Sequence, residues 1–166
     1  MARREVDTLQ LATGPYEVDK LSGPVVAGSI KFRHYKAEEL DLARDFVKSA
    51  ALPGTYFFDY YLMTDAARHI ASFMQPPMLK DIVPWLMRVD LVVFQGNKVW
   101  IIEFKDRLRP SGVGQLLSYK KLWLEQYGSG KGINLGYVAR DDDPTLHSTL
   151  TENKITWWIV PKTERT

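Results

Sequence analysis

Two apolar runs separated by a short polar break form the clearest pattern in the chain. They cover residues 89–94 and 99–104, and Gln95-Gly96-Asn97-Lys98 between them predicts a two-residue hairpin turn with glycine at its first central position. Because side chains alternate along a strand, Val89 is expected on the same face as Leu91, and both faces of the hairpin are apolar. We therefore expect two central strands that are covered on both sides, within an α/β or α+β fold.

The segments around this hairpin alternate between helical and strand-like patterns. The predicted helices cover residues 36–50, 64–73, 111–127 and a short segment that starts at Asp143-Pro144. The predicted strands cover residues 55–63, 132–139 and 155–160. Residues 1–35 contain glycines and prolines that suggest turns, so we expect an N-terminal arm or extra strands there. Residues 36–166 would then form the main part of a single domain.

The hairpin register places two acids opposite each other at the end far from the turn. If Gln95 pairs with Lys98, the same register makes Asp90 face Glu103, with Cβ atoms roughly 4.5–5.5 Å apart. Like charges repel at this distance, and a metal cation would turn that repulsion into binding. Lys105 shares the face of Glu103, so a structural ion pair is the alternative. The spacing alone is weak support, because Glu152-Asn153-Lys154 repeats it without a preceding apolar strand or a facing acid.

The predicted helix after the hairpin, which Ser111 could cap, carries two further candidates. Gln115 and Tyr119 are four residues apart and share a face with Trp123 and Gln126. A structural interpretation, in which Tyr119 and Trp123 are core aromatics with satisfied polar groups, remains open. An apolar stripe lies roughly opposite and could pack on the N-terminal arm or form a homodimer contact; it consists of Val113, Leu117 and Leu124.

Taken in order, these motifs resemble a known superfamily. Asp90, then Glu103-x-Lys105 on the next strand, then Gln115-x-x-x-Tyr119 on the following helix, resemble the PD-(D/E)xK nucleases, and the last element is similar to their RecB-like branch. One departure is that Val89 stands where the pattern has proline. The resemblance implies a restriction-endonuclease-like αβββαβ core with a central mixed sheet flanked by helices.

The resemblance also implies a chemistry. Asp90, Glu103 and the backbone carbonyl of Phe104 would hold Mg²⁺ or Mn²⁺, because hard divalent cations prefer such oxygen ligands. The cation would activate a water molecule, and Lys105 would position or help deprotonate it and stabilise the transition state. Gln115 and Tyr119 would support Lys105 or grip the substrate backbone. By the same resemblance, cleavage would leave a 5′-phosphate and a 3′-hydroxyl.

Other charged residues are weaker candidates. A third acidic ligand would come from the first helix, where Glu39 borders the core face, and His69 is the rival. Arg107 and Arg109 could contact DNA phosphates, since guanidinium groups suit phosphate, or could be solvated loop residues. Asp141-Asp142-Asp143 precedes a helix, so we interpret these acids as caps rather than metal ligands.

Composition limits the function classes. The 166 residues, 45% of them hydrophobic and 12% aromatic, can form a real core. There is no cysteine, which excludes disulfides and thiolate metal sites and fits an intracellular, cytoplasmic protein (the host cytoplasm if the source is viral). No signal-peptide pattern or membrane-length apolar run is present, so no membrane partner is expected. The net charge is only +2, so affinity for DNA would depend on local patches.

The leading hypothesis is a Mg²⁺- or Mn²⁺-dependent deoxyribonuclease that takes part in phage, viral or mobile-element DNA processing, repair or replication. The alternative is a catalytically silent module with the nuclease fold that binds DNA or takes part in assembly. A third interpretation is a purely structural hairpin with ion pairs. The sequence leaves open endonuclease or exonuclease action and DNA or RNA as substrate.

Overall fold

The computed structural model describes residues 7–30, 35–73 and 79–164, and its centre is a mixed sheet of six strands in the order β1-β2-β3-β4-β5-β6. Strands β1 to β4 pair antiparallel, whereas β4-β5 and β5-β6 pair parallel. The strand bounds are β1 Thr13–Val18, β2 Gly54–Leu62, β3 Met87–Gln95, β4 Lys98–Arg107, β5 Gly132–Asp141 and β6 Ile155–Ile159.

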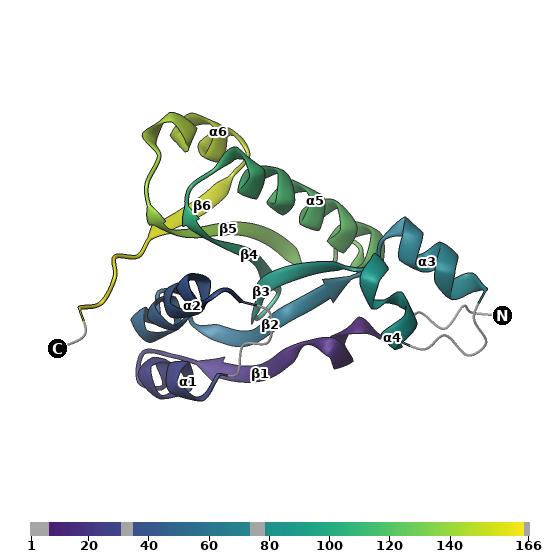
Figure 1. Ribbon diagram of the computed structural model, residues 1–166, viewed down its shortest axis with the longest axis horizontal. Helices are drawn as coiled ribbons and strands as arrows, with labels where there is room; N and C mark the ends of the chain where they lie inside the picture. The colour runs from purple at the N-terminus through teal and green to yellow at the C-terminus, as the bar shows by residue number, and fades with distance from the viewer. Residues whose placement is uncertain (1–6, 31–34, 74–78, 165–166) are drawn as a thin grey trace.

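Helices cover both faces of this sheet (Figure 1). On one face lie α1 (Gly23–Ser29) and α2 (Ala37–Ser49), and on the other lie α5 (Pro110–Tyr127) and α6 (His147–Glu152). Helices α3 (Asp65–Ser72) and α4 (Leu79–Ile82) form a separate group at one end of the molecule. Three short 3₁₀ helices complete the described elements: η1 Thr8–Leu11, η2 Val83–Trp85 and η3 Pro144–Leu146.

The core has two main apolar clusters, one on each face of the sheet. The cluster under α5 includes Leu116 and Trp123, and the cluster under α2 includes Leu42 and Phe46. The strands of the hairpin contribute to both, which confirms the prediction that they are covered on two sides. Because burial on both faces removes water from the sheet, only the strand ends are left to expose polar groups.

The element order agrees with the sequence pattern. Apart from α3, α4 and η2, which are inserted between β2 and β3, the series α2-β2-β3-β4-α5-β5 is an αβββαβ order, and the expected mixed sheet flanked by helices is confirmed. Thr64 caps α3 by accepting a hydrogen bond from the Ala67 N–H at 3.0 Å. Ser111 is not the cap of α5: the helix starts at Pro110 with Arg109 at the capping position. The fixed φ of proline suits a first helical position, so the capping position lies two residues earlier than the expected Ser111.

Strands β2 and β3 share an interruption halfway along their ladder. Phe58 pairs with Leu91 and Tyr60 pairs with Val89, but the intervening residues, Asp59 and Asp90, are missing from the ladder. Asp59 has a positive φ of 50°. The faces exchange here, because Val89 packs in the cluster under α5 while Leu91 packs under α2. The expected face of Val89 was therefore wrong, since an irregular residue breaks the alternation of side chains.

The apolar stripe proposed for α5 is also corrected. Val113 is only 6% exposed and belongs to the same core cluster as Tyr119 and Trp123. Leu117 and Leu124 do face outward, with 40% and 39% of their surfaces exposed.

The N-terminal region contributes β1, which pairs with β2 at the edge of the sheet, and α1, which packs beside α2. Residues 1–6 and 31–34 of the expected arm lie outside the described residues, as do residues 74–78. Among the helices that are described, none combines the length and apolar character needed to cross a bilayer.

Candidate active site

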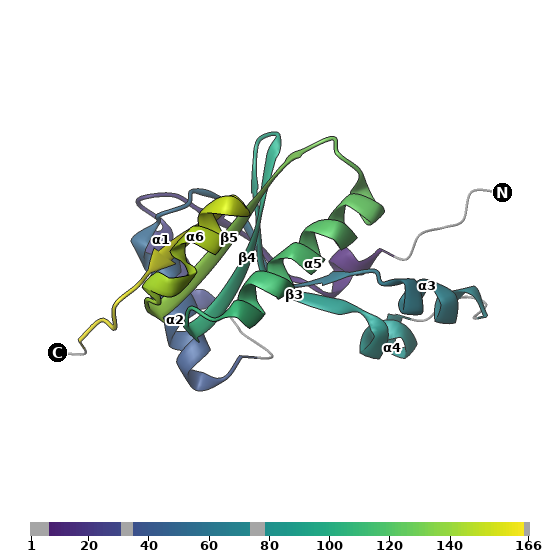
Figure 2. The same cartoon turned by 90° about the horizontal axis from the view of Figure 1, so that it is seen from above.

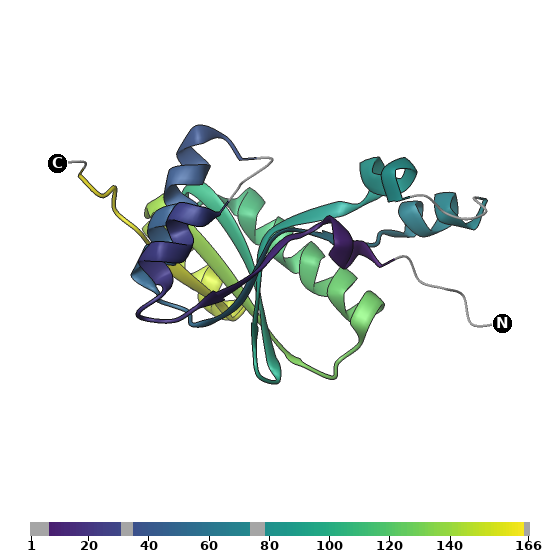
Figure 3. The same cartoon turned by 90° about the horizontal axis from the view of Figure 1, so that it is seen from below.

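The open end of the β3-β4 hairpin brings three predicted residues together. Pairing runs from Gln95–Lys98 to Leu91–Ile102, which is the predicted register, and Gly96 has a positive φ of 59° in the turn. One step further, the Phe104 N–H donates to Asp90 Oδ2 at 2.9 Å, and Lys105 Nζ lies 2.8 Å from Glu103 Oε1. Figures 2 and 3 show the turn on the opposite side of the molecule from this end, which lies near α2 and the first turn of α5.

The two acids are held in a desolvated, negatively charged environment. Glu103 is 2% exposed and Asp90 is partly buried. Burial, followed by the charge of Glu103, raises the pKa of Asp90 well above its usual value, although the Phe104 N–H and Lys105 act in the opposite direction. Burial alone would lower the pKa of Lys105, but the hydrogen bond and charge of Glu103, with Asp90 and Glu39, outweigh it and raise that pKa. Lys105 is therefore a cation at neutral pH.

Helix α5 adds a hydrogen-bonded pair to Glu103. The Tyr119 hydroxyl donates to Glu103 Oε2 at 3.1 Å, and Gln115 Nε2 donates to the same hydroxyl at 3.4 Å. Burial and the nearby charge of Glu103 raise the pKa of Tyr119, so its hydroxyl stays protonated and remains a donor. Tyr119 thus reaches Glu103 rather than Lys105. Trp123 instead packs on Tyr60 in the core, with ring centroids 5.5 Å apart.

Asp90 is held from a second direction by a residue that the sequence did not suggest. The Tyr35 hydroxyl donates to the backbone carbonyl of Asp90 at 2.5 Å. The β2-β3 ladder is interrupted at Asp90, and the Tyr35 hydroxyl is the donor that its carbonyl oxygen has there. Burial, and then the charge of Asp90, raise the pKa of Tyr35 well above its usual value. No local pattern signals this contact, because Tyr35 lies just before a helix and far from Asp90 in sequence.

The remaining candidates fall at different distances from the site. A hollow of about 260 Å³, which we call the Lys105 hollow, is lined by Lys36, Glu38, Glu39, Lys105, Asp106, Arg109 and Ser111. Glu39 and Arg109 are thus brought beside Lys105, and Arg109 pairs with Asp106 at 3.0 Å. Arg107 is exposed and lies near Asp143 rather than in this hollow.

His69 is not brought to this group. It lies on α3, with its ring packed edge-on against Phe73 at 4.9 Å, at the far end of the molecule from α2 (Figures 1 and 2). The cap interpretation of the acidic run is confirmed for Asp143, whose Oδ1 accepts from the Thr145 N–H at 3.1 Å. Its hydrogen bonds with Thr145 lower the pKa of Asp143.

The donor chemistry fits a divalent cation in part. Among residues 7–30, 35–73 and 79–164, no three Asp, Glu, His or Cys side chains are placed to hold a metal ion together. Asp90 and Glu103 are nevertheless close enough for the charge of Glu103 to raise the pKa of Asp90. Both Glu103 oxygens have protein partners, Lys105 and Tyr119, whereas within the described chain the hydrogen bond to the Asp90 carboxylate involves only Oδ2. Oδ1 keeps its capacity to bind. The pair therefore suits a hard cation that retains several waters.

Among known proteins, the chain has similarity at the level of parts of solved structures. No known protein-family model and no curated protein matches the chain. A solved structure of an EndoMS complex with double-stranded DNA is 20% identical over 47% of this chain and 33% of that chain, with a TM-score of 0.40. A repair endonuclease from Pyrococcus abyssi is 18% identical over 46% of this chain and 34% of that chain, also with a TM-score of 0.40. The chain spans about a third of the length of each protein.

Proposed function

We propose that this protein is a nuclease that hydrolyses DNA phosphodiester bonds with the help of Mg²⁺ or Mn²⁺. The observation that carries the proposal is the convergence of two carboxylates and one ammonium, from Asp90, Glu103 and Lys105, at the open end of a buried hairpin. A carboxyl pair whose charges repel, beside a lysine that stays protonated, is a costly arrangement for a purely structural role. It suits a site that receives a cation and a phosphate.

Each residue has a distinct role in this proposal. Asp90, Glu103 and the Phe104 carbonyl would hold the cation, with Glu39 as the additional ligand from α2. When bound, the cation would lower the pKa of a coordinated water and offset the charge of the phosphate. Lys105, with its raised pKa, would act as a charged donor to the phosphate and stabilise the negative charge that develops. Gln115 and Tyr119 would fix the orientation of Glu103, and Arg109 would contact a neighbouring phosphate.

The test is incubation of the purified protein with single-stranded, duplex and branched DNA, with and without Mg²⁺ or Mn²⁺. We expect metal-dependent cleavage that Glu103→Gln and Lys105→Met strongly reduce and that the surface variant Glu152→Gln leaves intact. Calorimetry with Mn²⁺ should show binding that Asp90→Asn abolishes. Salt-dependent DNA affinity that is indifferent to metal, with no cleavage of any substrate, would instead identify a catalytically silent DNA-binding module.

Several finer statements stay predictions. They are the setting in phage, viral or mobile-element DNA processing, the intracellular location and the homodimer. The exposed Leu117 and Leu124 give the homodimer a testable surface. Size-exclusion chromatography with light scattering would measure the mass of the particle in solution.

A further inference from the structure

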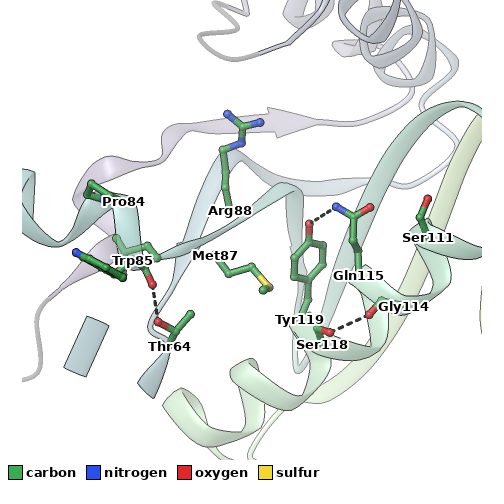
Figure 4. A pocket seen from close by; sticks show the side chains of 11 residues that line it. Thr64, Pro84, Trp85, Met87, Arg88, Ser111, Gly114, Gln115, Ser118 and Tyr119 are labelled. Carbon is green, nitrogen blue, oxygen red and sulfur yellow. Dashed lines mark hydrogen bonds between the residues drawn. The ribbon is translucent and has the colours of Figure 1, made fainter. Parts of the chain in front are cut away.

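A second and larger hollow is lined in part by Tyr119 (Figure 4). It has a volume of about 780 Å³ and is bounded by the first half of α5 and by the segment that leads from η2 into β3. We call it the α5 hollow. Its lining consists of Thr64, Pro84, Trp85, Leu86, Met87, Arg88, Ser111, Gly114, Gln115, Ser118 and Tyr119. In Figure 4, Met87 extends across this space toward Tyr119, and Trp85 lies at the end away from Tyr119.

The α5 hollow adjoins the proposed catalytic residues. Tyr119 lines it and donates a hydrogen bond to Glu103, and Arg88 precedes Asp90 by two positions in β3. Ser111 lines both the α5 hollow and the Lys105 hollow, so the two hollows share a wall residue at the start of α5. A chain of nucleotides that passes Lys105 could therefore occupy both.

The two hollows differ in their chemistry in a way that matches the two parts of a nucleotide. The Lys105 hollow contains three cationic side chains, from Lys36, Lys105 and Arg109, and three acidic ones, from Glu38, Glu39 and Asp106. The α5 hollow has one charged side chain among its described lining residues, Arg88, and none that is acidic. The rest of its lining is apolar, aromatic, hydroxyl or amide. Cations suit phosphates, whereas an apolar space with a few polar groups suits a base.

We propose that the α5 hollow holds an unpaired base of the substrate strand while the cationic side chains of the Lys105 hollow receive its phosphate. The proposal rests on the proposed nuclease function and specifies its substrate class as single-stranded or locally unpaired DNA. In a duplex, each base is stacked and paired, so it enters a side hollow only after it leaves the stack. The α5 hollow is within the size range of roughly 300–1,000 Å³ that small organic groups occupy.

Two further side chains that line the α5 hollow are suited to binding a nucleotide. The Trp85 side chain is at the end of the hollow away from Tyr119, and the residue is 49% exposed, which gives a flat surface for the next base. The Arg88 side chain remains 35% exposed although its Nε lies 3.7 Å from Asp59 Oδ1. Arg88 can therefore meet a phosphate or stack on a base at the entrance.

Gly114 allows the hollow to be filled without disturbing the core. A Cβ atom added at Gly114 meets nothing within 4 Å, and any other non-proline residue favours a helix more than glycine does. The Gly114→Phe variant should therefore fold and place its ring in the α5 hollow. Leu117→Phe is the matched control, because it adds an aromatic ring on the same helix at a position that is 40% exposed and outside the hollow.

The experiment measures the affinity of the full chain for a fluorescein-labelled oligothymidylate and for a labelled duplex, in EDTA so that metal-dependent cleavage is prevented. We expect Gly114→Phe to weaken single-strand binding by roughly 5- to 150-fold, the weight of one stacked base, and to leave duplex binding unchanged. Leu117→Phe should bind both as the unmodified chain does. Trp85→Ala should weaken single-strand binding by about 5-fold or more, whereas Phe73→Ala, at an aromatic residue that is 75% exposed outside the hollow, should not.

Single-strand affinity that is unchanged in a folded Gly114→Phe protein overturns the proposal, as does failure of the unmodified chain to bind the oligothymidylate. If Gly114→Phe does not fold, Ser118→Phe at the next turn of the same wall serves in its place. The two proposals fail separately. If Gly114→Phe loses single-strand binding and the unmodified chain cleaves no DNA, base binding in the α5 hollow is supported and the nuclease function is rejected. If the unmodified chain shows metal-dependent cleavage and Gly114→Phe binds single strands normally, the nuclease function is supported and base binding in the α5 hollow is rejected.

Discussion

Glu103-Phe104-Lys105 lies within the sheet, whereas Glu152-Asn153-Lys154, which has the same spacing, lies at the surface where α6 ends. Glu103 is 2% exposed and its two carboxylate oxygens contact Lys105 and Tyr119. Glu152 and Lys154 are both exposed, and Lys154 has a positive φ of 54° in the turn before β6. A shared spacing has thus produced two unrelated environments.

The difference shows that the surroundings, rather than the spacing, create the chemistry. In β4 the alternation of side chains places the acid and the lysine on one face, and β3 supplies Asp90 beside them. Burial then strengthens every charge interaction by lowering the local dielectric. At the end of α6 the chain turns between the acid and the lysine, and water screens both.

The largest expected effect is on the acid of the first triplet. Glu103→Gln should reduce metal-dependent DNA cleavage by about 10³-fold or more, because it removes a charged ligand and a preorganised electrostatic group. Glu152→Gln should leave the rate unchanged, since Glu152 is exposed at the end of α6. Initial rates on labelled DNA at saturating Mg²⁺ or Mn²⁺ measure both. A Glu103→Gln protein with a tenth of the normal rate would refute the proposed role.

Replacing the lysine should also lower the cleavage rate in the first triplet and not in the second, but by a smaller factor than replacing the glutamate. Lys105→Met should lower the cleavage rate on the order of 10²-fold, because the variant keeps the length of the side chain but loses the ammonium beside Glu103. Lys154→Met should have no effect on the rate. Equal rates for the two variants would mean that Lys105 serves only as an ion pair for Glu103.

The parts of this structure that follow local rules could be predicted from the sequence. The hairpin register followed from the glycine in the turn and from the apolar runs, and the structure reproduces it from Gln95–Lys98 to Leu91–Ile102. The helix and strand order followed in the same way. The pairing of Gln115 with Tyr119 followed from helical periodicity, and the structure confirms that they contact each other.

The parts that depend on contacts between distant segments could not be predicted. The face of Val89 depends on the interruption at Asp59 in the neighbouring strand, which no pattern within residues 89–94 reveals. The hydrogen bond from Tyr35 to Asp90 joins residues 55 positions apart. The α5 hollow requires α5 and the segment before β3 to lie side by side, which is a property of the assembled fold.

Tyr119 tests whether the support of Glu103 matters, because the second triplet has no equivalent of it. Tyr119→Phe keeps the buried ring and removes the hydroxyl that donates to Glu103 Oε2. We expect a reduction in cleavage of about 10-fold, typical of losing a group that orients a metal ligand. Tyr56→Phe is the matched control, since the Tyr56 hydroxyl donates to the Leu52 carbonyl at 2.5 Å and lines neither hollow. The control should lose stability without losing activity, and a comparable loss of activity in both variants would contradict the role of Tyr119.

The smallest expected effect is that of Asp90→Asn on the stability of the metal-free protein. Asp90 lies beside the first triplet, and the second triplet has no such acid among the described residues. The pKa of Asp90 is raised in the folded state, so folding favours its protonated form. The stability that this contributes is present below the usual pKa of an aspartate and is lost as the pH rises through the raised value. Asp90→Asn resembles the protonated form, so its melting temperature in EDTA at pH 7 should exceed that of the unmodified chain by roughly 2–4 °C, the response of a domain of this size to about 1 kcal/mol.

The sign of that change separates a carboxylate placed for binding from one placed for structure. The difference between Asp90→Asn and the unmodified chain should vanish in acid, and added Mn²⁺ should raise the melting temperature of the unmodified chain alone. Asp45→Asn should instead lower the melting temperature, because Asp45 lies 2.7 Å from the Arg140 guanidinium in a largely buried ion pair. If Asp90→Asn destabilises the metal-free protein as Asp45→Asn does, then Asp90 is a structural partner of the Phe104 N–H. The first triplet would then differ from the second in burial but not in function.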